Sequence, residues 1–132
     1  MPEAEERITE AELEVMRALW TAGEPQTLGQ LKEALARRLD WNGDTTKTLL
    51  RRLCQKGAVG QEKREVYYYR PLVSEGEFGR YRTQKLIDKL YAGSARALVA
   101  SLVEHEHLDR EDVAELRDLF DRLWEGEGGD GT

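Results

Sequence analysis

The stretch DTTKTLLRRLCQKG, from Asp44 to Gly57, has the periodicity of an amphipathic helix. At 100° per residue the apolar side chains gather on one side, where Leu49, Leu50, Leu53 and Cys54 lie. The opposite side carries Asp44, Thr48, Arg51 and Gln55, with Thr45 and Arg52 on one edge and Lys47 on the other. Thr is a poor helix former, so helix stability does not explain the composition of this polar face.

The polar face has the chemistry of DNA recognition. In the major groove, Arg and Lys hydrogen-bond to base edges, and the Thr methyl group can contact thymine methyls. A face that served only solubility would usually carry a matching run of acids, and this one has none. The predicted DNA contacts are Asp44, Thr45, Lys47, Thr48, Arg51, Arg52, Lys56, Lys63 and Arg64, of which Lys47, Arg52, Lys56, Lys63 and Arg64 are expected to hold phosphates.

Two further helices are expected before this stretch and a β-hairpin after it. Both helices open with a capping-box pattern, Thr9 with Glu12 and then Thr27 with Gln30. The second is expected to bury Leu28, Leu31, Leu35 and Leu39. Two β-prone runs, 58–63 and 66–71, are separated by a tight turn near Arg64. This order is typical of a winged helix-turn-helix, although a helical bundle with an incidental hairpin would give a similar pattern.

The rest of the chain predicts three more helices, beginning near Ser74, Ser94 and Asp109, and a glycine-rich tail over 126–132 that is expected to be disordered. We expect a winged-helix domain over 1–72 and a helical dimerisation region over 73–125. These helices carry more apolar surface than they can hide alone, so they either pack back on the N-terminal lobe or pair with a second copy. We favour the homodimer, with an interface formed by Leu86, Leu90, Leu98, Leu102, Leu116, Phe120 and Leu123.

The charge of the chain is unevenly distributed. Its net charge is −6 over 132 residues, but residues 41–71 hold 7 Lys and Arg against 3 Asp and Glu. Residues 1–40 hold 5 against 9, and residues 72–132 hold 8 against 14. Because charges are screened over roughly 8 Å at physiological salt, the basic middle third can still bind DNA in an acidic protein.

Other classes of function find little support in the residues. There is no Ser/His/Asp, Cys/His or phosphate-loop arrangement, so we expect neither an enzyme nor a cofactor. His105 and His107 are interpreted as part of a solvated loop rather than a metal site, and Cys54 as a small core residue. A single cysteine, no run of ~20 apolar residues and an acidic start without signal-peptide character indicate a soluble cytoplasmic protein.

Three segments carry a resemblance to a known family: ITEAELEVMRALW (8–20), DWNGDTTKTLLRRLCQKGAVGQEKREVYYYRPLVSE (40–75) and KLYAGSARALVASLVE (89–104). They resemble the penicillinase repressor family of BlaI, MecI and CopY, over about residues 7–124. The resemblance implies a dimeric winged-helix repressor that binds dyad operators and pairs through its C-terminal helices. In β-lactam-responsive members a sensor protease cuts an Asn–Phe bond in the dimerisation region.

The chain departs from that family in three places. The paired Cys-x-Cys motifs of copper-responsive members are absent, the position similar to the cleaved bond is Ser101–Leu102, and Asp44 stands where relatives often have a basic residue. The competing hypothesis is a winged-helix module that binds a protein partner and not DNA. Such a module should have lost the basic residues of the Thr45–Arg52 face and gained exposed apolar ones, and this sequence has not.

Overall fold

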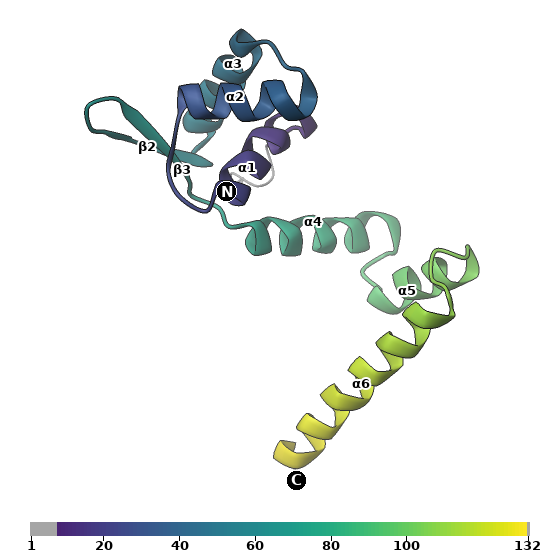
Figure 1. Cartoon of the computed structure of the whole chain (residues 1–132). Coiled ribbons are helices and arrows are strands. Elements are labelled where there is room, and N and C mark those ends of the chain that lie inside the picture. The colour runs from purple at the N-terminus through teal and green to yellow at the C-terminus, as the bar shows by residue number, and fades with distance from the viewer. Residues whose placement is uncertain (1–7, 132) are drawn as a thin grey trace. The chain divides into compact units, whose positions relative to one another are not determined.

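The computed structural model describes residues 8–131, with side chains up to Glu125 (Figure 1). The chain divides into two compact units between Thr83 and Gln84. The domain boundary predicted from the sequence lies at 72, before the fourth helix, whereas in the structure the first half of that helix belongs to the N-terminal unit.

The N-terminal unit alternates short helices with a small sheet. Its elements are α1 (Glu10–Ala22), β1 (Gln26–Thr27), α2 (Leu28–Leu39), α3 (Gly43–Lys56), β2 (Val59–Lys63), β3 (Tyr67–Pro71) and the first half of α4 (Glu75–Leu90). Both predicted capping boxes are confirmed: the hydroxyls of Thr9 and Thr27 accept from the third helical N–H, and the Glu12 and Gln30 side chains accept from the cap N–H. These reciprocal bonds satisfy amide groups that a helix start otherwise leaves unpaired.

The expected hairpin forms, but as part of a three-stranded antiparallel sheet in the order β1-β3-β2. Figure 1 shows β2 and β3 joined by a loop that projects away from α1–α3. The pairing of Gln26 with Tyr69 and Thr27 with Tyr68 adds β1 to the outer edge of β3. β1 was not predicted, because two residues carry no measurable period and the partner strand lies far along the chain.

The core of this unit lies between the three helices and the sheet. Met16, Leu19, Leu31, Leu35 and Leu53 are at most 1% exposed. The prediction that Leu39 is buried was wrong, since this side chain is 37% exposed at the end of α2. Deep burial of these large side chains supplies most of the stability of the unit.

The first half of α4 is packed on α1. Phe78 is buried, and its ring centroid lies 5.9 Å from that of Trp20. The Trp20 indole N–H donates to the Val73 carbonyl at 2.9 Å, just before α4 begins. The Arg82 guanidinium donates to the Ile8 carbonyl and to the Glu10 carboxylate, at 3.0 and 3.1 Å. These contacts explain why the unit extends beyond residue 72.

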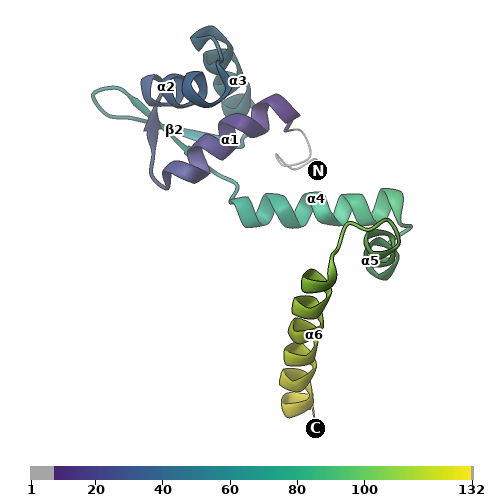
Figure 2. The same cartoon turned by 45° about the vertical axis from the view of Figure 1, so that its right-hand side comes forward.

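The C-terminal unit contains the end of α4, α5 (Ala95–Glu104) and α6 (Arg110–Gly131). Ser94 caps α5, and Asp109 and Asp112 exchange capping bonds at the start of α6, close to the predicted helix starts. Figure 2 shows α6 as one uninterrupted helix. It continues to Gly131, so the backbone is helical over most of the segment expected to be disordered; once a helix is nucleated, each further residue adds a hydrogen bond. Thr132 lies outside the described residues.

Large apolar side chains of the C-terminal unit are widely exposed. Leu90 is 69% exposed, Leu123 is 62% and Trp124 is 74%. Of the described side chains after Thr83, Ile87 is the one buried hydrophobic residue. None of the helices between residues 8 and 131 combines the length and apolar character that a bilayer crossing needs.

Candidate nucleic-acid interface

Helix α3 is fixed at both ends by local interactions. The Asn42 side chain caps the start by accepting from the Asp44 N–H at 2.7 Å. At the other end Gly57 adopts the left-handed conformation (φ 82°), which a residue with a Cβ adopts only with strain, and its N–H donates to the carbonyls of Leu53 and Cys54. With its apolar side held in the core, α3 presents the opposite face to solvent.

The solvent face of α3 carries the predicted contacts. The exposed residues are Asp44, Thr45, Lys47, Arg51, Arg52 and Gln55, and Thr48 is half-buried among them. In the part of the chain whose side chains are described, Lys47, Arg51 and Arg52 take part in no ion pair. No large apolar side chain of α3 is exposed. The face is therefore polar, and the positive charges of these three side chains are not neutralised by ion pairs with other described side chains.

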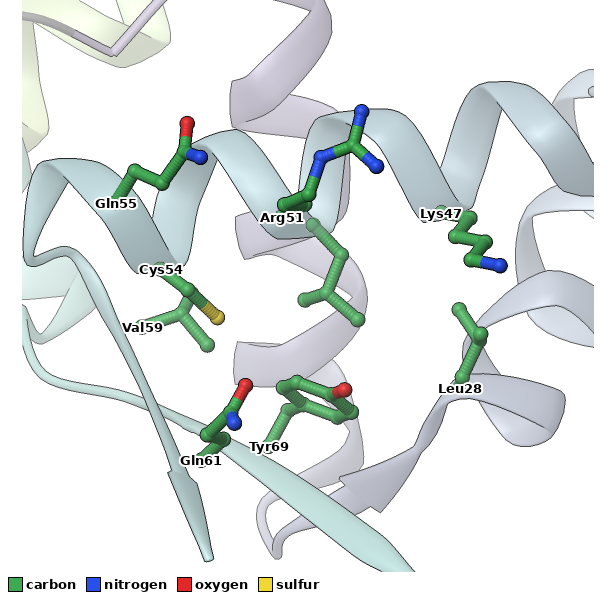
Figure 3. A pocket seen from close by; sticks show the side chains of 9 residues that line it. Leu28, Lys47, Arg51, Cys54, Gln55, Val59, Gln61 and Tyr69 are labelled. Carbon is green, nitrogen blue, oxygen red and sulfur yellow. The ribbon is translucent and has the colours of Figure 1, made fainter.

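A cleft of about 610 Å³ lies between α3 and the sheet (Figure 3). Its lining residues are Leu28, Lys47, Leu50, Arg51, Cys54, Gln55, Val59, Gln61 and Tyr69. In Figure 3, Lys47, Arg51 and Gln55 follow one another along α3, while Gln61 and Tyr69 face them from the strands. The floor is apolar, and the rim carries two cations and two amides.

Gln61 and Tyr69 are members of this site that were not predicted from the sequence, and Gln55 was not among the predicted contacts. Gln55 lies four residues after Arg51, on the same helix face, so the helical period could have included it. Gln61 and Tyr69 are paired directly across the β2–β3 ladder, so both side chains lie on one face of the sheet. That register depends on where the turn falls, which the sequence located only approximately.

The Cys54 thiol and the Tyr69 ring are both half-buried against the core at this cleft. Burial raises the pKa of the Cys54 thiol, so it stays protonated at neutral pH. Burial also raises the pKa of the Tyr69 hydroxyl, and the neighbouring Cys54 and Tyr67 raise it further. Both groups are therefore neutral, and the charge of the cleft comes from Lys47 and Arg51.

Two cations lie at the tip of the hairpin. The Lys63 ammonium lies 5.6 Å from the centroid of the Tyr67 ring, and the Arg64 guanidinium lies 4.6 Å from that of Tyr68. Arg64 also forms an ion pair with Glu62 at 3.3 Å, with both side chains about half exposed. Stacking on the tyrosines restrains the long cationic side chains in place.

Lys56 is placed differently from the other predicted contacts. Its ammonium lies 2.6 Å from Glu12 Oε1, at the junction of α3 with α1. The Glu12 side chain is 1% exposed. Burial raises the pKa of the Glu12 carboxyl, but hydrogen bonds from Lys56 and the Thr9 N–H, with the Lys56 charge, outweigh it and bring the pKa below its usual value. The Lys56 ammonium is therefore already paired with a carboxylate of the protein. Its predicted contact with a phosphate stays a prediction.

The predicted interface residues of the C-terminal unit fall into two groups. Leu86, Leu90, Phe120 and Leu123 are exposed, whereas Leu98, Leu102 and Leu116 are half-buried. The Ser101–Leu102 bond lies inside α5, and the Tyr91 hydroxyl donates to the Ser101 hydroxyl at 3.3 Å. His105 Nδ1 lies 2.9 Å from the Ser101 carbonyl oxygen, at the end of the same helix. The described side chains form no cluster of three or more potential metal ligands.

Comparison with known proteins agrees with this arrangement. The sequence pattern of the family described as Penicillinase repressor matches residues 8–122. The chain belongs to the penicillinase repressor family. It is 29% identical to the penicillinase repressor of Bacillus licheniformis over 116 residues, which cover 87% of this chain and 90% of that one. It is 33% identical to the methicillin resistance regulatory protein MecI of Mammaliicoccus sciuri over 117 residues, covering 87% and 94%.

The structural comparison concerns a little over half of this family member. The solution structure of the DNA-binding domain of the repressor BlaI matches with a TM-score of 0.51 and 31% identity. The match covers 58% of this chain and 93% of that domain. The predicted winged-helix fold is thereby confirmed.

Proposed function

We propose that this protein is a transcriptional repressor that binds double-stranded DNA through α3 and the β2–β3 hairpin, as a homodimer on a dyad operator in the cytoplasm. The observation that carries the proposal is the solvent face of α3, where Lys47, Arg51 and Arg52 form no ion pair within the described chain. Uncompensated cations on a rigid helix are suited to phosphates and to the acceptors of guanine in the major groove.

The cleft beside α3 supports one arrangement of the helix on the duplex. With α3 in the major groove, Thr48 and Arg51 face base edges. The sugar–phosphate strand that borders the groove then passes over the cleft between Gln55 and the sheet residues Gln61 and Tyr69. Amide and hydroxyl groups of this kind donate to phosphate oxygens and fix the register of the protein on DNA. Lys63 and Arg64 at the hairpin tip would hold the adjacent backbone.

The exposed apolar residues of the C-terminal unit support the homodimer. Leucine, phenylalanine and tryptophan side chains exposed together along one helix are typical of a protein–protein interface. In a dimer their burial would hold two copies of α3 about one duplex turn, or a multiple of it, apart. Pairing makes the second half-site contact intramolecular, which raises apparent affinity by about 10²–10⁴.

A sensor protease is the proposed partner that relieves repression. A cut at Ser101–Leu102 would divide α5 and separate α6 from the DNA-binding unit. Because this bond lies within a helix, a protease must first unwind α5, whose side chains are all at least partly exposed. The competing protein-interaction module has no observation in its favour, since α3 exposes no large apolar side chain.

The decisive test is selection of DNA fragments by the purified protein, followed by titration of the selected duplex at several salt concentrations. We expect a dyad sequence to be enriched. If about three cations per subunit engage phosphates, the slope of log K against log salt should be about −5 for the dimer. Failure to enrich any sequence, together with a slope flatter than about −2, would contradict the proposal.

A further inference from the structure

Glu12 is a buried carboxylate that DNA binding as proposed above does not use. It lies in the first turn of α1, and its Oε1 atom accepts two hydrogen bonds, from the Thr9 N–H at 2.9 Å and from the Lys56 ammonium at 2.6 Å. A charged group removed from water is costly unless it is paired and hydrogen-bonded, and here both conditions are met. The pair joins the start of α1 to the last turn of α3.

The cap of α1 does not require this charge. In the equivalent position of α2, Gln30 makes the same pair of reciprocal bonds with Thr27, at 2.8 and 3.1 Å. An amide oxygen therefore suffices for the capping box. What the carboxylate of Glu12 adds, beyond the cap, is its bond to Lys56.

The place where Lys56 is held matters for recognition. Lys56 ends α3, and the predicted base-reading residues Thr48 and Arg51 lie eight and five residues before it on the same helix. Productive hydrogen bonds to base edges tolerate displacements of only about 0.5 Å, so the supporting contacts of a recognition helix affect affinity. The apolar side of α3 restrains its depth in the core, and the pair with Glu12 restrains its end.

We propose that Glu12 is a positioning residue for DNA reading, which holds Lys56 and thereby sets the orientation of α3, so that Lys56 acts through Glu12 and not as a phosphate contact. This inference rests on the proposed DNA-binding function. It predicts that Lys56 and Glu12 are energetically coupled in binding to the specific site, and that neither contributes to binding of random DNA.

The test uses the full-length protein in four forms besides the unchanged one: Glu12→Gln, Lys56→Met, both together, and Glu10→Gln. The last is a matched control. Glu10 occupies the same turn of α1 and also pairs with a cation, Arg82 at 3.1 Å, but its side chain is 82% exposed and its partner lies on α4. The probes are the duplex selected above and a random duplex of equal length, each titrated at several salt concentrations.

We expect Lys56→Met to weaken binding of the selected duplex about tenfold, with an unchanged salt slope and unchanged binding of the random duplex. In the Glu12→Gln background the same substitution should have little further effect, and Glu10→Gln should bind as the unchanged protein does. Equal losses from Lys56→Met in both backgrounds, with a salt slope reduced by about 1.8 for the dimer, would show that Lys56 neutralises a phosphate and would overturn the inference.

A measurement without DNA separates this inference from the proposed function. Amide NMR shifts of Thr48 and Arg51 in the free protein should move in Glu12→Gln and not in Glu10→Gln. Unmoved shifts in Glu12→Gln would overturn the positioning role even if the protein binds its operator. If Lys56→Met alone does not fold because it leaves an unpaired buried charge, the double variant, which removes both charges, gives the same comparison against Glu12→Gln.

Discussion

The two units of this protein differ in how far their apolar side chains are buried. In the N-terminal unit, Leu31, Leu35 and Leu53 are at most 1% exposed, around a core closed by three helices and a sheet. In the C-terminal unit, helices of similar apolar content leave Leu123 and Trp124 mostly exposed. The first unit has the features of a domain that folds by itself, and the second has those of a surface that another copy completes. In the function proposed above, the first unit reads DNA and the second unit dimerises.

The largest expected effect comes from the exposed apolar surface. Phe120→Glu should produce a monomer and lower operator affinity by about 10²–10⁴, because the second half-site contact is no longer intramolecular. Sedimentation and operator titration on the same samples measure both quantities. The control is Leu39→Glu, the same change at an exposed leucine of the N-terminal unit, which should leave both unchanged. A Phe120→Glu protein that stays dimeric would contradict the proposal that the exposed apolar residues of the C-terminal unit form the dimer interface.

The second largest expected effect is on stability, because truncating a leucine should cost more in the N-terminal unit than in the C-terminal unit. Leu53→Ala should lower the free energy of unfolding by about 2–5 kcal/mol, because a fully buried side chain leaves a cavity. Leu119→Ala, at a 52% exposed position, should cost under about 1 kcal/mol in the monomer. Denaturant unfolding at several protein concentrations measures both. A cost for Leu119→Ala that is large at every concentration would mean that the C-terminal unit has a core of its own.

On the DNA-reading face the expected effects are smaller and depend on the sequence of the DNA. Arg51→Ala and Thr48→Ala should each weaken binding of the selected duplex by about 1–3 kcal/mol, since they remove base-edge contacts. Binding of random DNA should fall much less. The matched substitution Arg96→Ala, at an exposed arginine in α5, should change neither affinity. Equal losses of affinity for the selected and random duplexes would show that this face contacts only the sugar–phosphate backbone of the DNA.

The smallest expected effect concerns one polar atom inside the N-terminal core. Thr46 is fully buried in α3, and its hydroxyl oxygen has no hydrogen-bond partner among the residues that the structure describes. Thr46→Val keeps the shape and removes that hydroxyl, so stability should rise by up to about 1 kcal/mol. Thermal unfolding measures the change, with Thr45→Val at the exposed neighbouring position as the control. A loss of stability in Thr46→Val would indicate that the hydroxyl has a partner.

The features that could be predicted from the sequence are those whose governing interactions are local. The capping boxes at Thr9 and Thr27, the helix starts near Ser74 and Ser94 and the outward face of α3 were all predicted, and the structure confirms them. Each depends on residues within about four positions along the chain, so the hydrogen bonds and the 3.6-residue period are visible in the sequence. The assignment to the penicillinase repressor family likewise rests on contiguous motifs.

Tertiary structure decided the features that join distant residues. The sequence does not show that Lys56 meets Glu12, that Gln61 and Tyr69 face α3 across a cleft, that β1 joins the sheet, or that the first half of α4 packs on α1. Each of these contacts depends on how separate elements are packed. The packing is stabilised by the burial of apolar side chains from all elements of the core, so no single segment of the sequence determines it. A lysine among basic neighbours looks like a phosphate contact in the sequence, and its placement beside a buried carboxylate is the basis of the different role proposed for Lys56.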